Sequence, residues 1–408
     1  MQVATQNSTV PRLRFKEFGG DWEEKKLEEI ILDFIVPMRD KPKNLSGNIP
    51  WCRIEDFNGK YLSKSKSSQG VSKELAKEMN LKIYPVNTVL VSCSANLGFC
   101  SIVKKPLITN QTFIGLFPSK FIDSEFLLYF MRLSARKLNT LSSGTTISYL
   151  SRKQFEKFKL HIPEINEQEK IASFLSAVDE IIQQLERKKS LLEVYKKGVM
   201  RQLFSQEIRF KDENGNNYPD WEERKLREVA EYRRGSFPQP YGLKKWYDDE
   251  NGFPFIQVFD VADNMKLKSE TKRKISEEAK ALSVYVKKGT IVLTIQGSIG
   301  RIAITQYDAC VDRTLLIFQS FKHPIDTVFF TYVVFLLFEI EKRNAPGGTI
   351  KTITKEVLSN FKVKLPSLEE QQKIASFLSG LDKKIELVDM QIQQSKTFKK
   401  GLLQQMFV

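Results

Sequence analysis

The chain has 408 residues, of which 41% are hydrophobic and 28% are charged, a balance that is typical of a folded protein of two or three domains. It excludes wholesale disorder and collagen-like structure. The formal net charge of +15, from 64 Lys and Arg against 49 Asp and Glu, favours an anionic partner, with nucleic acid ahead of a membrane surface. A basic surface that is merely solvated is the alternative, so charge by itself does not decide the function.

The four cysteines are Cys52, Cys93, Cys100 and Cys310. No Cys-x-x-Cys pair exists, so a zinc ribbon is not indicated, and four cysteines are too few for a disulfide scaffold. This usage, with an N-terminal segment that lacks the apolar core of a signal peptide, favours a cytoplasmic protein. The longest apolar run is Val328–Phe338, about half of the roughly 20 residues that a membrane-spanning helix needs, so we predict a buried helix there.

One unit of about 200 residues occurs twice in the sequence, and such self-similarity is the first guide to the architecture of a chain. The paired segments, at offsets of 199 to 203 residues, are Asp21–Ile30 with Asp220–Val229, Thr88–Ile102 with Thr290–Ile304, Ile122–Phe130 with Ile325–Val333, and Ile165–Ile182 with Leu368–Ile385. The similarity is high in the last pair and low across residues 31–87 and 230–289. Divergence inside a shared frame favours two equivalent modules that recognise different things over uniform drift after a duplication.

Each copy begins with a module of about 160 residues and mixed secondary structure. Short β-rich strands end at turns, a capped helix and a Gly/Thr-rich loop follow, and a last strand closes on a proline. The paired features are strands at Thr88–Ser92 and Ile291–Ile295, turns at residues 95–98 and 297–300, N-caps at Asp123 and Asp326, loops at residues 144–146 and 347–349, and closing prolines at Pro163 and Pro366.

Each copy ends with a predicted helix of about 40 residues, roughly 60 Å long at 1.5 Å per residue. Its apolar residues repeat every seven positions, as the a and d rows of a coiled coil do. The predicted rows are Ile171, Val178, Leu185, Leu192 and Val199 with Phe174, Ile181, Lys188, Tyr195 and Gln202 in the first copy, and Ile374, Leu381, Val388, Ser395 and Leu402 with Phe377, Lys384, Gln391, Phe398 and Gln405 in the second. Because both helices belong to one chain, we predict that they pair with each other; dimerisation between two chains is the alternative.

The positive charge belongs to the modules and not to the helices. The net charge is +10 in residues 1–163, zero in 164–210, +4 in 211–366 and +1 in 367–408, as expected if the modules contact phosphates. The sequence has no Gly-rich phosphate loop, no nucleophile elbow and no Asp/Asn-Pro-Pro-aromatic tetrapeptide of an amino-methyltransferase. His161 and His323 have no partner at metal-ligand spacing. We therefore predict a binding and scaffold protein with no catalytic residues and no bound metal.

Two motifs, each present twice, carry a family resemblance. The first is Pro11-Arg12-Leu13-Arg14-Phe15 followed by Asp21-Trp22-Glu23, with Tyr218–Glu222 as its counterpart. The second is a proline, then Glu-Gln and Lys-Ile-Ala-x-x-Leu, at Pro163, Glu167, Gln168, Lys170, Ile171, Ala172 and Leu175, and again at Pro366, Glu370, Gln371, Lys373, Ile374, Ala375 and Leu378. Over nearly its whole length the chain resembles the specificity (S) subunit of type I restriction–modification systems.

The resemblance implies an α+β fold in which two pseudo-repeated globular α/β target recognition domains are separated by a long antiparallel two-helix coiled coil. Residues 1–163 and 207–366 would be the recognition domains, and residues 164–206 and 367–408 the spacer helices. Each recognition domain would read one half of a bipartite DNA sequence, and the coiled coil would set the gap between the halves.

The resemblance also implies partners and cofactors. The chain would bind double-stranded DNA, two methyltransferase (M) subunits and restriction (R) subunits, and no membrane. It would hold no cofactor itself; S-adenosylmethionine would belong to the M subunits, and ATP and Mg to the complete endonuclease. Two alternatives are a stand-alone sequence-specific DNA-binding regulator and a coiled-coil adaptor with no nucleic-acid role.

Base edges are read by polar and basic side chains on loops, whereas phosphate contacts position the protein. The predicted DNA contacts are Arg53, Lys60, Lys64, Lys66, Asn96, Thr145 and Thr146 in the first module, and Arg233, Arg234, Lys244, Lys245, Gln296, Ser298, Arg301 and Lys351 in the second. Asn110-Gln111-Thr112 and Asp312-Arg313-Thr314 align at an offset of 202, and for them DNA contact and hydrogen bonding to buried backbone are two open interpretations. The predicted docking residues for the M subunits are Glu167, Gln168, Lys170, Phe174, Glu370, Gln371, Lys373 and Phe377; helix capping and seam packing are the alternative.

Overall fold

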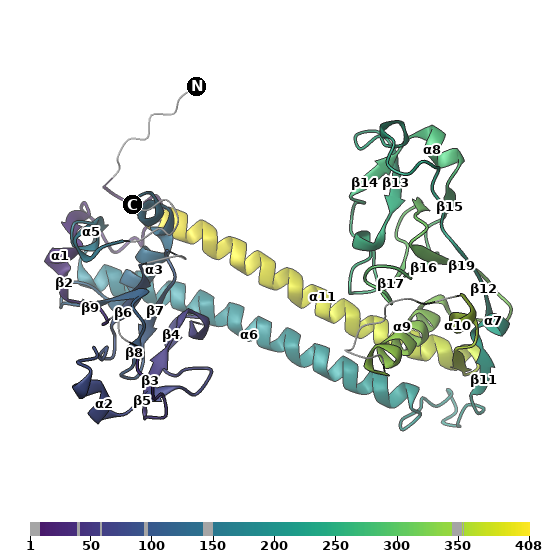
Figure 1. The fold of residues 1–408 in the computed structure, drawn as a ribbon, viewed down its shortest axis with the longest axis horizontal. Helices are drawn as coiled ribbons and strands as arrows, with labels where there is room; N and C mark the ends of the chain where they lie inside the picture. The colour runs from purple at the N-terminus through teal and green to yellow at the C-terminus, as the bar shows by residue number, and fades with distance from the viewer. Residues whose placement is uncertain are drawn as a thin grey trace. The chain divides into compact units, whose positions relative to one another are not determined.

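The computed structural model describes residues 9–38, 41–57, 59–93, 97–141, 150–344, 353 and 355–408. The chain forms two compact units, one made of Met1–Lys188 with Val388–Val408 and the other of Lys189–Leu387 (Figure 1). Each unit thus contains one module, part of the helix that follows the first module and part of the helix that follows the second. The compact units therefore cross the predicted domain boundaries.

The first module has a β-rich core with helices on it. Its elements are β1 (Glu23–Lys26), α1 (Leu27–Ile30), β2 (Ile31–Ile35), β3 (Ile49–Cys52), the 3-10 helix η1 (Ile54–Asp56), β4 (Tyr61–Leu62), β5 (Gly70–Val71), α2 (Lys73–Glu78), β6 (Val89–Ser92), β7 (Cys100–Val103), β8 (Ile108–Thr109), β9 (Phe113–Pro118), α3 (Ser124–Leu133), α4 (Ala135–Leu141), α5 (Arg152–Glu156) and β10 (Lys159–Ile162). One sheet has the strand order β2-β9-β6-β7-β4, a second has β5-β3-β8, and β1 pairs with β10. Helix α3 contacts β6 and β7 (Figure 1).

The second module repeats this plan. Its elements are β11 (Glu222–Lys225), α7 (Leu226–Val229), β12 (Ala230–Arg234), η2 (Lys244–Trp246), β13 (Phe253–Ile256), η3 (Val258–Asp260), β14 (Arg273–Ile275), α8 (Glu277–Ala281), β15 (Val284–Val286), β16 (Ile291–Thr294), β17 (Ile302–Ile304), β18 (Ala309–Val311), β19 (Leu315–Phe321), α9 (Thr327–Asn344), α10 (Lys355–Ser359) and β20 (Lys362–Leu365). Its sheets are β12-β19-β16-β17, β14-β13-β18-β15 and β11-β20. The strand orders match those of the first module except for one additional strand in each, β4 in the first and β15 in the second, so the duplication seen in the sequence is confirmed in the topology.

Two long helices follow the modules, α6 (Ile165–Phe204) and α11 (Leu368–Gln405). In the first unit the beginning of α6 and the end of α11 share one hydrophobic core, and in the second unit the end of α6 and the beginning of α11 share another. The helices therefore pair in opposite directions within the chain. The predicted α+β fold, with two repeated modules and an antiparallel helix pair, is confirmed.

The predicted N-caps and the buried apolar helix are also confirmed. The carboxylate of Asp123 accepts hydrogen bonds from the backbone N–H groups of Glu125 and Phe126 at 2.9 and 2.8 Å. Asp326 does the same for Phe329 at 2.8 Å. The apolar run around residues 328–338 lies in α9, and its largest side chains are buried in the second module. Within the described ranges, no helix is long and apolar enough to cross a membrane.

A glycine at the end of the turn allows a helix to pack closely against it in each module, the start of α4 against Gly98 and α9 against Gly300. Gly98 and Gly300 occupy equivalent places and have φ angles of +91° and +87°, which residues other than glycine rarely adopt. A Cβ atom on Gly300 would lie 2.7 Å from the ring of Phe338, and one on Gly98 would lie 2.2 Å from the Cβ atom of Ala135. The glycine of this turn is therefore required for both the backbone conformation and the packing.

The a row of each predicted helix seam is correct, whereas the companion row is wrong by one residue. Ile181, predicted on the seam, is 53% exposed, whereas the adjacent Ile182 is only 8% exposed. The same shift occurs in α11, where Phe398 is 57% exposed. The observed companion rows are Leu175, Ile182, Lys189, Lys196 and Leu203 in α6, and Leu378, Ile385, Ile392, Lys399 and Met406 in α11. Positions i+3 and i+4 lie on the same helix face, and tertiary contacts select i+4 here.

The corrected seam places a lysine of one helix opposite an aspartate of the other. In the second unit, Lys196 of α6 pairs with Asp382 of α11 at 2.5 Å, and Tyr332 of α9 donates a hydrogen bond to the same aspartate. In the first unit, Lys399 of α11 pairs with Asp179 of α6, and Tyr129 of α3 donates to that aspartate at 2.7 Å. Each polar cluster ties a module to both long helices.

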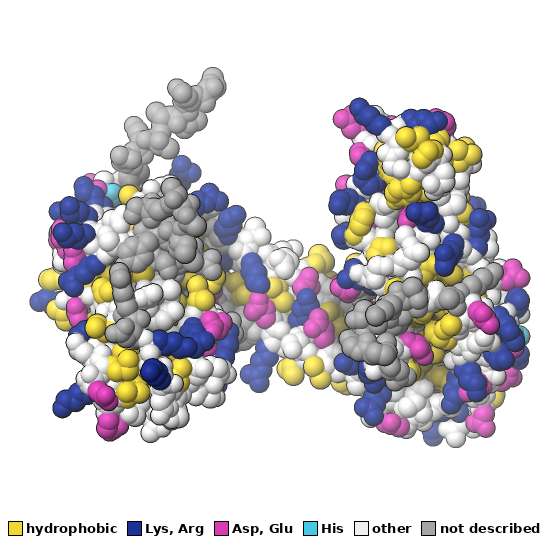
Figure 2. All heavy atoms as spheres, viewed as in Figure 1, with side chains coloured by type: hydrophobic (Ala, Val, Ile, Leu, Met, Phe, Trp, Pro, Cys, Tyr) yellow, Lys and Arg dark blue, Asp and Glu magenta, His cyan; other side chains and the backbone are white. Residues whose placement is uncertain are grey.

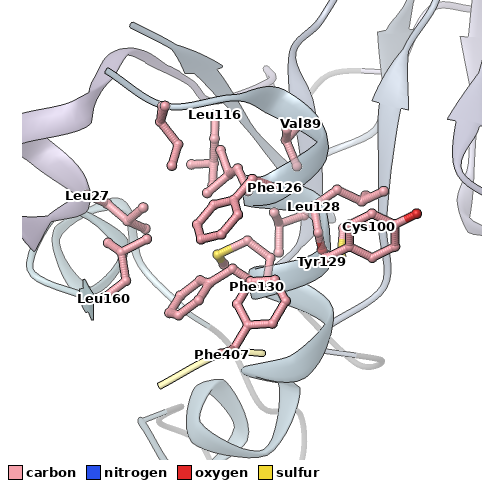
Figure 3. Packing of buried hydrophobic residues seen from close by; sticks show 14 of the residues in the cluster. Leu27, Val89, Cys100, Leu116, Phe126, Leu128, Tyr129, Phe130, Leu160 and Phe407 are labelled. Atoms are coloured by element: carbon pink, nitrogen blue, oxygen red, sulfur yellow. Dashed lines mark hydrogen bonds between the residues drawn. The ribbon is translucent and has the colours of Figure 1, made fainter. Parts of the chain in front are cut away.

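Each module core includes residues from the other copy's helix. Leu402, Met406 and Phe407 are buried in the core of the first module, where Phe407 lies beside Phe126 (Figure 3). The ring centroid of Phe407 lies 5.0 Å from that of Phe126 and 6.4 Å from that of Trp22. Residues from the end of α6 take the equivalent place in the second module. Each module is therefore completed by a helix end that belongs to the other repeat.

Candidate nucleic-acid interface

In each module a buried aspartate fixes the loop that follows the first strand of a parallel pair. Strands β3 and β8 run parallel, as do β13 and β18. Asp56 accepts hydrogen bonds from the backbone N–H groups of Arg53 and Lys66, both at 2.7 Å. Asp260 accepts the two equivalent bonds at 2.8 and 2.9 Å, and burial raises its pKa although these donors oppose the shift. The loop is thus held by the same two hydrogen bonds in both modules, and in the first module it carries the predicted DNA contacts Arg53, Lys64 and Lys66.

Three predicted contacts of the first module lie around η1. Arg53 follows β3, and its guanidinium lies 3.8 Å from a carboxylate oxygen of Glu55. Lys64 and Lys66 are exposed after β4, and the ammonium of Lys66 also donates to the backbone oxygen of Glu55. These three basic side chains share one loop region at the surface.

Lys60 has an internal partner instead. Its ammonium pairs with Glu125 of α3 and hydrogen-bonds to Ser176 of α6, and its side chain is only 11% exposed. Burial disfavours the Glu125 carboxylate, but hydrogen bonds from Lys60, Tyr61 and Ser176 together lower the pKa of Glu125. These contacts account for the position of Lys60 without DNA.

The basic residues predicted in the first part of the second module are at the surface. Arg233 and Arg234 are exposed on the edge strand β12 and line a cavity with apolar residues behind them. Lys244 is exposed in η2, whereas Lys245 pairs with Glu278 at 2.8 Å. Exposed surface ion pairs are weak, so Lys245 remains able to exchange this partner for a phosphate.

The turn between β16 and β17 presents one exposed polar side chain and one arginine that forms an ion pair. Gln296 is exposed at the tip. The backbone oxygen of Ser298 accepts a hydrogen bond from the Thr294 hydroxyl at 2.6 Å, which closes the turn. Arg301 pairs with Asp263 at 3.0 Å, so its guanidinium is directed toward a neighbouring loop.

Four predicted contacts, Asn96, Thr145, Thr146 and Lys351, lie outside the described residues. Figure 2 shows Lys and Arg side chains mixed with Asp and Glu over the visible face of each module, so charge density on that face does not single out one patch. In the part of the chain that the structure describes, no three His, Cys, Asp or Glu side chains gather as a metal site.

The glutamates of the repeated Glu-Gln motif are buried in salt bridges. Arg14 donates from Nε and Nη2 to the two carboxylate oxygens of Glu167, both at 2.8 Å, and this hydrogen bonding raises the pKa of Arg14. Arg209 forms the same fork with Glu370 at 3.1 and 2.8 Å, and Trp221 adds a third donor at 3.1 Å. Each glutamate thus joins one long helix, α6 or α11, to the segment that precedes a module, residues 10–22 or 208–221, here called the arm.

The glutamines of the motif are saturated by the module itself. Gln168 accepts a hydrogen bond from the backbone N–H of Asp123 at 3.0 Å and donates to the backbone oxygens of Phe121 and Pro163 at 3.0 and 2.9 Å. Gln371 makes the three equivalent bonds. Glutamine at this position therefore connects the long helix to the N-cap residue of α3 or α9.

The remaining motif residues contact the same arms. Phe174 packs edge-to-face on Phe15 at 5.7 Å, and Phe377 packs on Phe210 at the same distance. Lys170 lies 3.6 Å from Glu17, and the ammonium of Lys373 donates to a backbone oxygen of the second arm at 2.8 Å. Glu167, Gln168, Glu370 and Gln371 are thus buried, whereas Lys170 keeps an exposed side chain.

Arg14 and Arg209 were not predicted as partners of these glutamates. A signal was present, because an apolar-Arg-Phe tripeptide occurs at Leu13-Arg14-Phe15 and again at Ile208-Arg209-Phe210. In both, the arginine pairs with the glutamate, and the phenylalanine packs on the phenylalanine that lies seven residues after that glutamate in the long helix.

Comparisons with known proteins agree with this duplicated architecture. The family model for the type I restriction modification DNA specificity domain matches residues 19–194 and again 218–395. The MjaVIII and MjaIX specificity subunits of Methanocaldococcus jannaschii are 28% and 25% identical to this chain, covering 95% and 94% of it and 94% and 92% of their own lengths. The crystal structure of a type I restriction–modification S subunit from M. genitalium matches with a TM-score of 0.61 at 16% identity, covering 98% of this chain and 99% of that one. The chain therefore belongs to the type I restriction–modification DNA specificity family and is a specificity subunit with two recognition domains.

Proposed function

We propose that this chain directs a type I restriction–modification complex to a bipartite DNA sequence, with each module reading one half. The observation that carries the proposal is that one module topology occurs twice in the chain. In both copies the glutamine of the helix motif forms the same hydrogen bond to the N-cap residue of the module. Two sites built alike but diverged in their loops suit two half-sites of different sequence. The net positive charge of both modules supports phosphate contact.

We further propose that α6 and α11 set the gap between the half-sites. Helices of this length are stiff spacers, and the lysine–aspartate pairs on the seam fix how they align. Inserting seven residues into both helices, at the same level of the seam, lengthens the spacer by about 10 Å, on the order of three base pairs. The expected result is an unchanged pair of half-sites with a longer gap; an unchanged gap would contradict the proposal.

We propose that two methyltransferase subunits, which bring S-adenosylmethionine, dock on this chain, and that restriction subunits, which use ATP and Mg, join them. The chain itself is proposed to hold no cofactor.

Because four of the predicted docking side chains are buried, we propose exposed helix positions instead as the docking surface for the methyltransferase subunits. Tyr195 and Phe398 occupy equivalent positions and are 52% and 57% exposed, and at Gly198 and Gly401, three residues further on, an added Cβ would meet nothing within 4 Å. Tyr195 adjoins Leu191 and Val194 on α6, which are 61% and 66% exposed, and a contiguous exposed apolar patch of this kind marks an interaction surface.

The test of the function is methylation mapping. The chain is co-expressed with its methyltransferase subunit in a host free of adenine methylation, and the genome is sequenced for modified adenine. A single bipartite motif that disappears without this chain is expected. An assembled complex that modifies no defined sequence would refute the proposal.

The docking surface has a separate readout. Tyr195→Ser and Phe398→Ser are expected to reduce co-purification of the methyltransferase subunit, whereas Leu32→Ser, at a 69% exposed apolar residue of β2, serves as a control that removes an exposed apolar side chain away from the long helices. Full retention of the methyltransferase by the double variant would contradict the proposed surface.

A further inference from the structure

In the second module three chain segments meet at the carboxyl ends of a parallel strand pair. β13 pairs with β18 in parallel, so Gln257 and Asp312 follow at the same end. The backbone N–H of Asp312 donates to Ile256 at 3.0 Å, and that of Ile295 donates to Thr314 at 3.0 Å. The turn that begins at Gln296 therefore also starts beside residue 313. The crevice outside the carboxyl ends of parallel strands is a common place for ligand binding.

Two polar side chains at this junction are held by one tyrosine. The amide nitrogen of Gln257 donates to the hydroxyl of Tyr241 at 2.8 Å, and the guanidinium of Arg313 lies 5.3 Å from the centroid of the same ring. Tyr241 rests in turn on Phe237, with 5.1 Å between the ring centroids. Both functional groups are thereby oriented before any partner binds.

Arg313 differs in its partners from two of the basic candidates of this module. Lys245 and Arg301 have carboxylates at 2.8 and 3.0 Å. Among the residues that the structure describes, no Asp or Glu forms an ion pair with Arg313, and its side chain is exposed. Stacking on an aromatic ring leaves the hydrogen-bonding edge of a guanidinium available for planar recognition.

The residues on either side of the central position bond to each other, and in the second module the carboxylate of Asp312 also accepts a hydrogen bond from the backbone N–H of Thr314 at 3.3 Å. The hydroxyl of Thr314 donates to Asp312 at 2.5 Å, and in the first module the hydroxyl of Thr112 donates to Asn110 at 2.6 Å. The middle residue, Arg313 or Gln111, is exposed. The tripeptide is therefore a closed turn that presents its central side chain outward.

The first module has the same junction with the residue types exchanged. β3 and β8 are parallel, and Cys52 pairs with Thr109, so Arg53 and Asn110-Gln111 follow at one end. Arg53 occupies the place of Gln257, including the backbone hydrogen bond to the buried aspartate. The first module thus offers Arg then Gln, and the second offers Gln then Arg.

We propose that Gln257 with Arg313, and Arg53 with Gln111, are the base-reading pairs of the two modules. Arginine bonds bidentately to the O6 and N7 of guanine, and glutamine to the N6 and N7 of adenine, so each half-site would contain a guanine and an adenine read by these residues. The proposal rests on the proposed DNA-specificity function and adds the side chains that carry it. Asp56 and Asp260 are positioning residues that hold the first member of each pair.

The test uses the full chain in complex with its methyltransferase subunit. The wild-type motif is mapped first, and absence of any motif would refute the function itself and not the assignment of the pairs. Arg313→Ala is then compared with Arg227→Ala, an exposed arginine on α7 that loses the same charge. Binding is measured on a duplex with the mapped motif, on duplexes with single substitutions in it and on a scrambled duplex.

Arg313→Ala is expected to weaken binding to the motif by about 10- to 100-fold and to abolish discrimination at one guanine of one half-site, with the other half-site unchanged. Arg313→Lys, which keeps the charge and cannot form the bidentate contact, is expected to lose the same discrimination while it retains binding to the scrambled duplex. Gln257→Ala is expected to relax one adenine of that same half-site. Equal losses on all duplexes, or an unchanged motif in all three variants, would overturn the assignment.

Discussion

Replacing Phe407 by alanine is expected to destabilise the first module, although the two are far apart in sequence. The ring is 6% exposed and lies between Trp22 and Phe126. Removing a buried phenylalanine ring costs about 3–5 kcal/mol through lost burial and the cavity left behind. Against a typical stability of about 5–15 kcal/mol, this raises the population of the opened first unit by roughly a hundredfold or more.

The matched control is Phe204→Ala. Phe204 has the equivalent place at the end of α6, where it contacts Trp221 and Phe329 with centroid distances of 6.1 and 5.5 Å. It is only partly buried, so a smaller loss of about 2 kcal/mol is expected, and in the second unit.

Hydrogen exchange read by mass spectrometry distinguishes the two units, whereas a single melting temperature of a chain with two units is not well defined. Phe407→Ala is expected to accelerate exchange in peptides from β6 and α3 and to leave β16 and α9 unchanged, and Phe204→Ala to give the reverse. If Phe407→Ala accelerated exchange in the second module, or in neither, the exchange of helix ends between the two cores would be refuted.

Three further outcomes follow from the contacts described. Glu370→Ala leaves Arg209 without its buried carboxylate and is expected to lower the free energy of unfolding of the second unit by about 3–5 kcal/mol, measured by denaturant titration; Glu370→Gln, which removes the charge but keeps the size of the side chain, is expected to lose a large part of this, and a Glu370→Gln variant as stable as the wild type would contradict a role for the charge. Gly198→Ala is expected to stabilise α6 by roughly 1 kcal/mol, because an added Cβ meets nothing within 4 Å; a lower denaturation midpoint would contradict this. Burial raises the pKa of the cysteine thiols to about 12 in Cys52 and Cys100 and about 11 in Cys93 and Cys310, so at pH 8 at most about one thiol in a thousand is ionised. Iodoacetamide is therefore expected to label the native protein slowly, faster toward pH 11 and readily in urea, and rapid native labelling at pH 8 would contradict the burial.

The sequence was sufficient to predict the duplication, the N-caps and the first row of each seam, because these depend on local pattern and on repetition. It was not sufficient to choose between Ile181 and Ile182 as the companion row, since both are apolar and both lie within one turn of Val178. Contacts of the arms with Phe174 and Phe377 draw those two rings away from the seam. That choice depends on residues more than 150 positions distant.

In the candidate interface, too, residue types were predictable from the sequence, whereas contacts between distant residues were not. Residue type identified Arg53 and Lys64 as basic loop residues, but it gave no sign that Lys60 meets Glu125, which lies 65 residues further along the chain. The Glu-Gln motif was recognisable from its repetition, yet its buried bonds to Arg14 and to the N-cap of α3 depend on the folded arrangement.

One compact unit is a single segment of the chain and the other consists of two segments, and this difference has a consequence for folding during synthesis. The second unit is one uninterrupted stretch, Lys189–Leu387, whereas the first needs Val388–Val408. A ribosome that adds about 5–20 residues per second takes on the order of 10–50 s to proceed from Ile162 to Leu402. Throughout that interval the nascent first module exposes apolar surface around Trp22 and Phe126 to chaperones. The half that is translated last is therefore expected to complete its core first, so that vectorial synthesis and the order of folding run in opposite directions.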